Sequence, residues 1–287
     1  MALQLLLIGL AMGMIYALLA MGLILIVKAV GVLNFAHGDL FMVGAYICFL
    51  LTVQVQMPVI AIVLSAIVIF FVFGTLFMFS VYWPLRNSQW PITVVICTLG
   101  ASFVLSEGVR IIFGPFGLRT EPIIAGFTQI GQARLQNQYL LIIVVSILLI
   151  AFVFTLFEKM RLGRIMQAAA QNRYAAELLG IPTIVTIVAT YIISTTLAGI
   201  GGWLIAPIFM VSQVLGVFAI YAFAGIVIGG FGSVKGAVIG SIFIGIVQAF
   251  AIMVTTNYQD VIVFAMLILM LMIRPRGLFG EKIGDKA

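Results

Sequence analysis

The sequence has few charged residues, which make up 8% of its 287 positions, whereas hydrophobic residues make up 64%. Soluble domains usually contain about 25% charged and roughly 45–50% apolar residues. No soluble fold of this length could bury so much apolar surface, so the composition excludes a soluble protein. A helix that crosses a bilayer needs about 20 mostly apolar residues, and such stretches follow one another along the chain. Lipid is therefore the predicted main solvent.

Cysteine and histidine are scarce as well, with two cysteines and one histidine. Cys48 and Cys97 lie far apart in apolar segments and lack metal-ligand spacing, which argues against a disulfide framework or a zinc site. His37 is the only histidine and has no partner ligand near it in the sequence, so it is weak evidence for a metal site or a proton relay. Paired catalytic carboxylates, a nucleophile elbow and a phosphate-binding glycine-lysine motif are missing as well. The sequence thus predicts a protein that is not itself an enzyme and binds no cofactor.

The formal charge of +6 does not indicate nucleic-acid binding. The basic residues are dispersed between apolar runs and form no stripe or arm of the kind that contacts phosphates. Membrane topology explains their distribution better.

Nine apolar segments predict an all-α polytopic membrane protein with about eight or nine transmembrane or re-entrant helices, in one domain covering residues 1–287. The segments are residues 5–27, 31–53, 58–82, 91–113, 138–157, 184–208, 214–232, 236–256 and 259–273. Glycine is frequent in the second and seventh segments, so either of them could be a broken or re-entrant helix. Small residues recur at four-residue spacing, as in Gly9/Gly13 and Gly225/Gly229, which predicts close packing of helix backbones.

The basic residues also predict the orientation, because short loops rich in Lys and Arg stay on the cytoplasmic side. With the C-terminus inside, eleven of the 14 basic residues fall inside: Lys28, Arg86, Lys159, Arg161, Arg164, Arg173, Lys235, Arg274, Arg276, Lys282 and Lys286. The other three, Arg110, Arg119 and Arg134, fall at or beyond the outer face. Residues 158–182 are then a cytoplasmic loop and residues 114–137 an extracytoplasmic loop. The N-terminus lies outside, although merging or splitting one glycine-rich segment would reverse that end.

The second segment contains the tightest cluster of unusual residues, Asn34, His37, Gly38 and Asp39. Polar and ionisable side chains at membrane depth are costly unless they face a cavity or a partner, so they mark a solute pathway. We therefore expect a helix that is broken near Gly38 and borders the translocation pathway at mid-membrane. A compatible structural interpretation is that Asn34 and Asp39 cap the two ends of the break and satisfy backbone groups that lipid leaves unpaired.

Glu107, in the fourth segment, is a further candidate for the pathway. Arg110 follows one helical turn later on the same face, so the two side chains can neutralise each other. A structural pair within one helix is the competing interpretation.

The loop at residues 158–182 predicts a short alanine-rich helix over residues 164–179. Gly180 suits a left-handed C-terminal cap, and Pro182 prevents continuation. Small side chains fall on one face and form a narrow surface that can enter a groove on a partner, at Ala168, Asn172, Ala175, Ala176 and Leu179. Arg164 flanks this face. A plain connector is the alternative.

With these residues in view, the chain resembles the permease subunits of bacterial branched-chain amino acid ATP-binding-cassette importers. The resemblance covers nearly the whole chain and rests on residues 13–18, 32–39, 163–181 and 229–237. The asparagine-phenylalanine-alanine-histidine-glycine element at residues 34–38 is the most specific of these. Asp39 stands where family members often have glutamate, which preserves the charge.

The resemblance implies a type II importer-like fold in a bacterial inner membrane and several partners. These are a homologous second permease subunit, two cytoplasmic ATPase subunits that hold ATP and Mg²⁺, and an extracytoplasmic solute-binding protein. In that scheme the helix at residues 164–179 would dock into an ATPase subunit. The solute would be a branched-chain amino acid, but similar permeases serve urea, short amides and aromatic acids.

An ion-driven secondary transporter is the alternative function, and Asp39 and Glu107 would be its intramembrane coupling carboxylates. A membrane-bound enzyme lacks support, because the single histidine and the scattered acids form no catalytic set.

Overall fold

The computed structural model describes residues 2–86, 88, 90–131, 133–254, 258–275 and 277–279. The elements in chain order are α1 (Ala2–Val30), α2 (His37–Phe49), η1 (Leu50–Gln54), α3 (Val59–Phe77), η2 (Met78–Tyr82), η3 (Trp83–Leu85), α4 (Ile92–Phe113), β1 (Phe127–Ile130), β2 (Ala133–Gln136), α5 (Asn137–Lys159), α6 (Arg161–Gln171), α7 (Arg173–Leu178), α8 (Thr183–Ile205), η4 (Gln213–Val217), α9 (Phe218–Gly229), α10 (Val234–Val254) and α11 (Gln259–Ile273). The turns η1 and η2 are π-helical continuations of α2 and α3.

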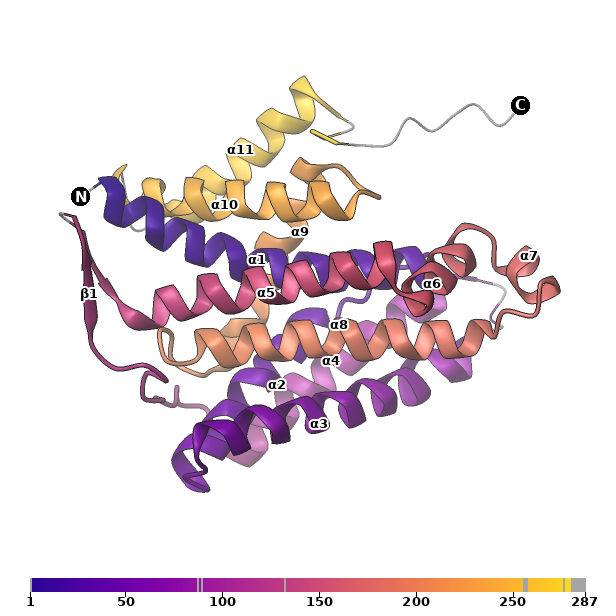
Figure 1. Cartoon of the computed structure of the whole chain (residues 1–287), viewed down its shortest axis with the longest axis horizontal. Coiled ribbons are helices and arrows are strands. Elements are labelled where there is room, and N and C mark those ends of the chain that lie inside the picture. Colours follow the sequence, from indigo (N-terminus) through magenta and orange to yellow (C-terminus); the bar gives the residue numbers. More distant parts are fainter. Residues whose placement is uncertain are drawn as a thin grey trace.

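Seven of these helical segments are long and apolar enough to cross a membrane, and two shorter apolar ones lie at 213–229 and 259–273. Together they match the nine predicted segments. Figure 1 shows most of the long helices side by side along the long axis of the molecule. The predicted all-helical membrane architecture is therefore confirmed for the described part of the chain.

Helix α1 forms the centre of the bundle, and most of its residues are buried. It packs closely on α10 because glycines on both helices remove the side chains between them. A Cβ atom built on Gly13 would lie 2.7 Å from the Cα of Ile242, and one built on Gly9 would lie 2.9 Å from the Cβ of Ala249. The predicted role of the small-residue rows in helix packing is confirmed here.

The break in the second apolar segment precedes the predicted position. Residues 31–36 are non-helical, and Gly38 lies within the first turn of α2. The expected break near Gly38 is therefore wrong. Asn34 causes the earlier turn, because its Oδ1 accepts a hydrogen bond from the N–H of Ala36 at 3.1 Å and its carbonyl accepts one from His37 at 3.2 Å.

Gly38 serves close packing instead. A Cβ atom at this position would lie 2.2 Å from the carbonyl oxygen of Gly216. Asp39 does not cap the break either, since its Oδ1 accepts a hydrogen bond from the hydroxyl of Ser106 at 2.7 Å. Asn34 therefore satisfies a backbone N–H in the turn before α2, but neither residue caps that helix, whose N-cap is Ala36.

Two long helices are each followed by an irregular stretch and a short helix: α1 by α2, and α8 by η4 and α9. The two long helices run antiparallel, because the end of α1 and the beginning of α8 line one cavity through Leu25 and Thr190. Helix α2 packs on α8, and α9 packs on α1. The starting ends of the two short helices meet where Gly38 contacts Gly216. The pair α1–α2 and the pair α8–α9 therefore run in opposite directions and meet at the contact between Gly38 and Gly216.

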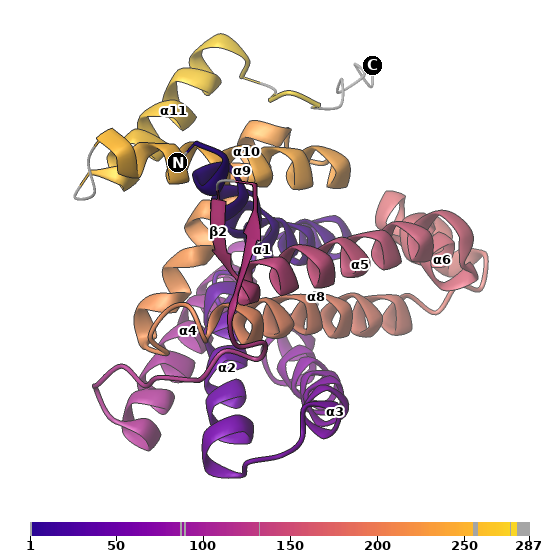
Figure 2. The ribbon, with the colours of Figure 1, turned by 60° about the vertical axis from the view of Figure 1, so that its left-hand side comes forward.

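The loop at residues 114–137 contains a hairpin that the sequence analysis did not predict. Strands β1 and β2 pair antiparallel, with Phe127 opposite Gln136. A backbone bridge between Leu118 and Val211 joins the same loop to the stretch that precedes η4. Figure 2 shows the two strands together near the N-terminus, away from α6.

Candidate functional site

A cavity of about 600 Å³ lies where α2 and α9 begin. The structure brings four of the predicted pathway residues to its wall, namely Asn34, His37, Gly38 and Asp39. The opposite wall comes from η4 and α9 and includes Gln213. Helix starts that meet at a cavity inside a membrane protein are typical of solute sites.

Two of these residues anchor the start of α2. His37 is buried, and its Nε2 donates a hydrogen bond to the carbonyl oxygen of Leu19 on α1 at 3.1 Å. Because a carbonyl only accepts, Nε2 carries the ring proton. Asn34 is only 3% exposed, and its Nδ2 has no partner among the described residues. The arrangement fixes α2 against α1 and leaves an amide donor at the cavity wall.

Asp39 supplies the negative charge of the site. It is 6% exposed and lines the cavity, where the hydroxyl of Ser106 holds one of its carboxylate oxygens. Gln213 donates from Nε2 to the carbonyl oxygen of Ser106 at 3.3 Å and so links α4 to η4. A carboxylate with this support can accept a cationic group without moving.

Glu107 lies elsewhere. Its Oε2 is 2.7 Å from Nη2 of Arg110, and both side chains are about half exposed on α4. It is not among the residues that line the cavity. The predicted intrahelical pair is therefore confirmed, and the candidate pathway contains only the other four predicted residues.

The contributions of α4 and η4 to the site were not predicted from the sequence. Ser102 lines the cavity one turn before Ser106. The two serines at four-residue spacing face the same way and could have been detected as a polar stripe on an apolar helix. Gln213 gave no periodic signal, because it begins the short 3-10 helix η4.

The predicted partner-binding loop forms two helices instead of one. Helices α6 and α7 are separated by Asn172, whose backbone is extended, with φ −153° and ψ 101°. Its Oδ1 accepts a hydrogen bond from the N–H of Ala175 at 3.0 Å and so caps α7. The continuous helix over 164–179 is therefore wrong, since an asparagine side chain competed with the helical backbone. Figure 1 shows both helices at the end of the bundle opposite the hairpin.

The end of this segment follows the prediction. Gly180 has φ +77°, the N–H of Ile181 donates to the carbonyl of Ala176 at 2.9 Å, and that of Gly180 donates to Glu177 at 3.0 Å. This is the paired bonding of a glycine-terminated helix. A hydrogen bond from the hydroxyl of Thr183 lowers the pKa of the Glu177 carboxyl, and Arg173 lowers it further.

The exposed surface of the segment also differs from the one predicted. Ala176 is 3% exposed and packs inward, so it does not form the centre of a docking face. Leu178 and Leu179 are 72% and 81% exposed, and Tyr174 is exposed beside them. Arg164 and Ala168 are exposed on α6. These exposed apolar side chains, and not the predicted face of small residues, are the candidates for a contact surface.

Comparison with known proteins defines the family. Residues 5–271 match the family model described as the permease component of the branched-chain amino acid transport system. The chain belongs to this family. It is therefore a multi-pass membrane permease, the component of a transport system through which solute crosses.

Full-length relatives agree with this assignment. The high-affinity branched-chain amino acid transport system permease protein LivH of Escherichia coli K12 is 31% identical over 97% of this chain and 95% of that protein. The corresponding protein BraD of Pseudomonas aeruginosa is 31% identical over 99% of this chain and 97% of its own length.

The solved structure of PsaBC from Streptococcus pneumoniae in complex with Fab overlays with a TM-score of 0.49 and 11% identity, over 94% of this chain and 91% of that one.

Proposed function

We propose that this branched-chain amino acid permease family member is the membrane subunit of an ATP-driven importer in the bacterial inner membrane. Its solute is a branched-chain amino acid, as the names of its relatives indicate for those proteins. Its partners are a homologous second permease subunit, two cytoplasmic ATPase subunits and an extracytoplasmic solute-binding protein. ATP and Mg²⁺ bind to the ATPase subunits. The observation that carries the proposal is the family match over residues 5–271.

The cavity at the start of α2 supports a pathway for a zwitterion. Asp39 offers a carboxylate that attracts the α-ammonium group of an amino acid. The start of α2 and the start of the continuous η4–α9 segment present the positive ends of two helix dipoles, which favour the α-carboxylate. The rest of the wall is mainly apolar, with Phe35, Val217 and Phe223, and suits a branched aliphatic side chain. Urea and short amides lack the charges that this wall complements.

The surface on α6 and α7 supports contact with an ATPase subunit. Arg164 and Ala168 on α6 and Leu179 beyond α7 are exposed, and Asn172, Ala175 and Gly180 shape the turn between and after the helices. Residues 158–182 lie at the end of the bundle opposite the hairpin, which fits a cytoplasmic coupling loop and an extracytoplasmic loop at 114–137. Ala176 supports the surface from behind.

The test is uptake by proteoliposomes that contain the chain, its partner subunits and the solute-binding protein. Labelled leucine should accumulate only when ATP faces the ATPase subunits, and unlabelled isoleucine and valine should compete. Urea, acetamide and phenylalanine should compete weakly. Uptake that needs no ATP and stops when an ionophore collapses the ion gradients would establish the ion-driven alternative.

A further inference from the structure

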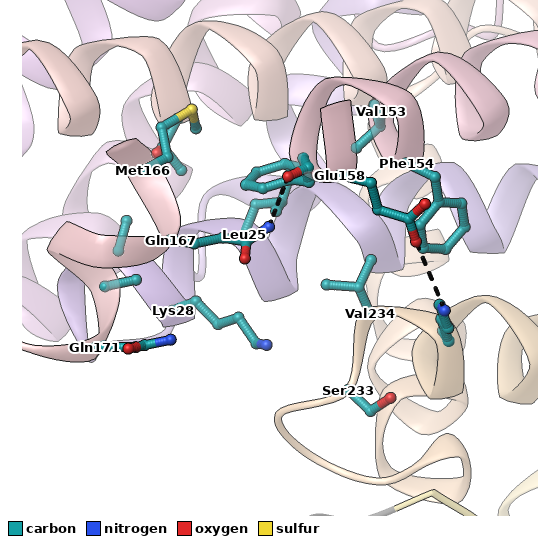
Figure 3. Close-up of a pocket in the computed structure, with 15 residues that line it drawn as sticks. Leu25, Lys28, Val153, Phe154, Glu158, Met166, Gln167, Gln171, Ser233 and Val234 are labelled. Atoms are coloured by element: carbon teal, nitrogen blue, oxygen red, sulfur yellow. Dashed lines mark hydrogen bonds and ion pairs between the residues drawn. The ribbon is translucent and has the colours of Figure 1, made fainter. Parts of the chain in front are cut away.

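A second cavity, of about 590 Å³, lies at the end of the bundle where α1 and α5 end and α8 and α10 begin. Figure 3 shows its lining residues, which come from these helices and from α6. Helix ends that share one level in a membrane protein mark the boundary between lipid tails and headgroups. The cavity is thus placed at a membrane surface.

The two parts of the cavity differ in chemistry. Its buried wall is mainly apolar, with Leu25, Val153 and Met166 beside the single buried hydroxyl of Thr190. Its rim contains two lysines, Lys28 and Lys235, and one acid, Glu158. Nζ of Lys235 lies 3.7 Å from Oε1 of Glu158, so this pair is close to neutral and Lys28 gives the rim a net positive charge. An apolar slot with a cationic rim matches a molecule with an aliphatic chain and an anionic head.

The cavity opens on a different side of the bundle from the pathway. Helix α1 borders both cavities, but the pathway cavity is otherwise lined by residues 33–35, α2, α4, η4 and α9, while this one is lined by α5, α6, α8 and the start of α10. Figure 2 shows α4 and α5 on opposite sides of the ribbon. Along α5 next to the cavity, Leu148 and Phe152 are exposed apolar side chains. These features are those of a surface that faces lipid.

We propose that the cleft between α5 and α10 binds one anionic phospholipid from the leaflet at this end of the bundle. Its phosphate lies between Lys28 and Lys235, and an acyl chain lies along Leu25 and Val234. Basic pockets between transmembrane helices bind phospholipid headgroups by this combination of charge and apolar contact. Because α6 lines the same cleft, and Nε2 of Gln167 bonds the Phe157 carbonyl there at 2.9 Å, the lipid would bridge the partner-binding segment and α10.

The experiment measures retained phosphatidylglycerol in the purified, assembled transporter by native mass spectrometry, and thermal stability in phosphatidylcholine nanodiscs with and without added phosphatidylglycerol. The variant Lys28→Gln with Lys235→Gln should retain this lipid about fivefold less for each lysine removed. It should also lose the stabilisation. Lys159→Gln, an exposed lysine outside the cavity, is the matched control and should behave like the parent chain.

Two further arms test the apolar part and the source of the phosphate. Val234→Trp fills the slot without changing charge and should displace the lipid. Ala170→Phe, from α6, should do the same and is the second variant in case one of the two folds poorly. Inorganic phosphate alone should give no stabilisation. Equal lipid retention by the lysine variant, retention by both filled variants, or stabilisation by inorganic phosphate would each overturn the proposal.

Discussion

At the scale of single residues, the contact between Gly38 and Gly216 is the tightest constraint on the pathway. It brings the backbone at the start of α2 into contact with the backbone of η4, and no side chain fits between them. Asn34, His37 and Asp39, which lie beside Gly38 in the sequence, form the cavity wall next to this contact. The glycine contact therefore fixes the position of these polar residues.

Replacing Gly38 should therefore destabilise the fold. In Gly38→Ala the new Cβ atom would begin 2.2 Å from the carbonyl oxygen of Gly216, and the helices must separate to admit it. We expect a loss of about 1–3 kcal/mol, measured by thermal unfolding in detergent. The matched control is Gly108→Ala on α4, where nothing among the described residues beyond the adjoining helical backbone lies within 4 Å of the added group. Equal stability of the two variants would show that the contact is loose.

Asp39 should matter for transport more than for folding. Asp39→Asn keeps the shape and can still bond Ser106, but it removes the charge that attracts an ammonium group. We expect leucine uptake to fall at least about tenfold, the effect of losing roughly 1.4 kcal/mol, while co-purification with the other subunits is unchanged. Asp39→Glu should retain most of the activity. An equal loss of uptake and of assembly in Asp39→Asn would favour a structural role.

At the scale of elements, the sequence predicted helices better than their interruptions. The nine apolar segments correspond to helices because lipid requires every backbone group to be bonded within its segment. The break at residues 31–36, the corner at Asn172 and the hairpin at 127–136 depend on single side-chain bonds and on contacts between distant segments. The pathway residues at 34–39 were found because polarity at membrane depth is unusual, whereas Ser102 and Gln213 join the site only through tertiary packing.

The corner at Asn172 moves the expected contact with the ATPase subunit to the exposed leucines. Leu179→Arg would place a cation within the contact and should weaken retention of the ATPase by about thirtyfold, the effect of losing a central residue worth roughly 2 kcal/mol. Phe116→Arg, an equally exposed apolar residue in the loop at 114–137, is the control and should leave retention unchanged. Pull-down from mild detergent provides the measurement. Full retention in Leu179→Arg would show that α6 and α7 are only a connector.

The side-chain bonds of Glu177, which join α7 to the start of α8, should respond to acid. The pKa of Glu177 is lowered in the folded protein by its bonds with Thr183 and Arg173, so its contribution to stability is present above the ordinary glutamate value of about 4.3 and is lost as the pH falls through the folded value. Amide hydrogen exchange in residues 173–180 should therefore accelerate in acid, after correction for the intrinsic rate. Glu177→Gln should show the faster exchange already at neutral pH. Identical protection factors in the two chains would contradict this.

At the scale of the whole molecule, charged residues from distant parts of the sequence gather at one end of the bundle. The ends of α1 and α5 and the start of α10 bring Lys28, Glu158 and Lys235 together. The sequence placed both lysines on one side, and the structure brings them to one end. Arg276, Lys282 and Lys286, which entered the same prediction, lie outside the described residues. The side of the membrane follows from the bias of basic residues and stays a prediction.

Site-directed labelling tests that orientation. With Cys48 and Cys97 replaced by alanine, Thr128→Cys in the hairpin should react with an impermeant maleimide in intact cells, and Tyr174→Cys in α7 should react only after permeabilisation. Both positions are exposed, so accessibility within the fold is matched. The reverse pattern would place the hairpin in the cytoplasm.

The meeting point of α2 and α9 also has a mechanical consequence. Interlocked side chains resist sliding, because each must leave its groove or change rotamer before the helices can shift. Between Gly38 and Gly216 there is backbone on both sides, so α2 can slide past the start of the η4–α9 segment without any side chain having to move at that point. The pairs α1–α2 and α8–α9 run in opposite directions, so the same small slide would shift the wall of the cavity toward one membrane surface and away from the other.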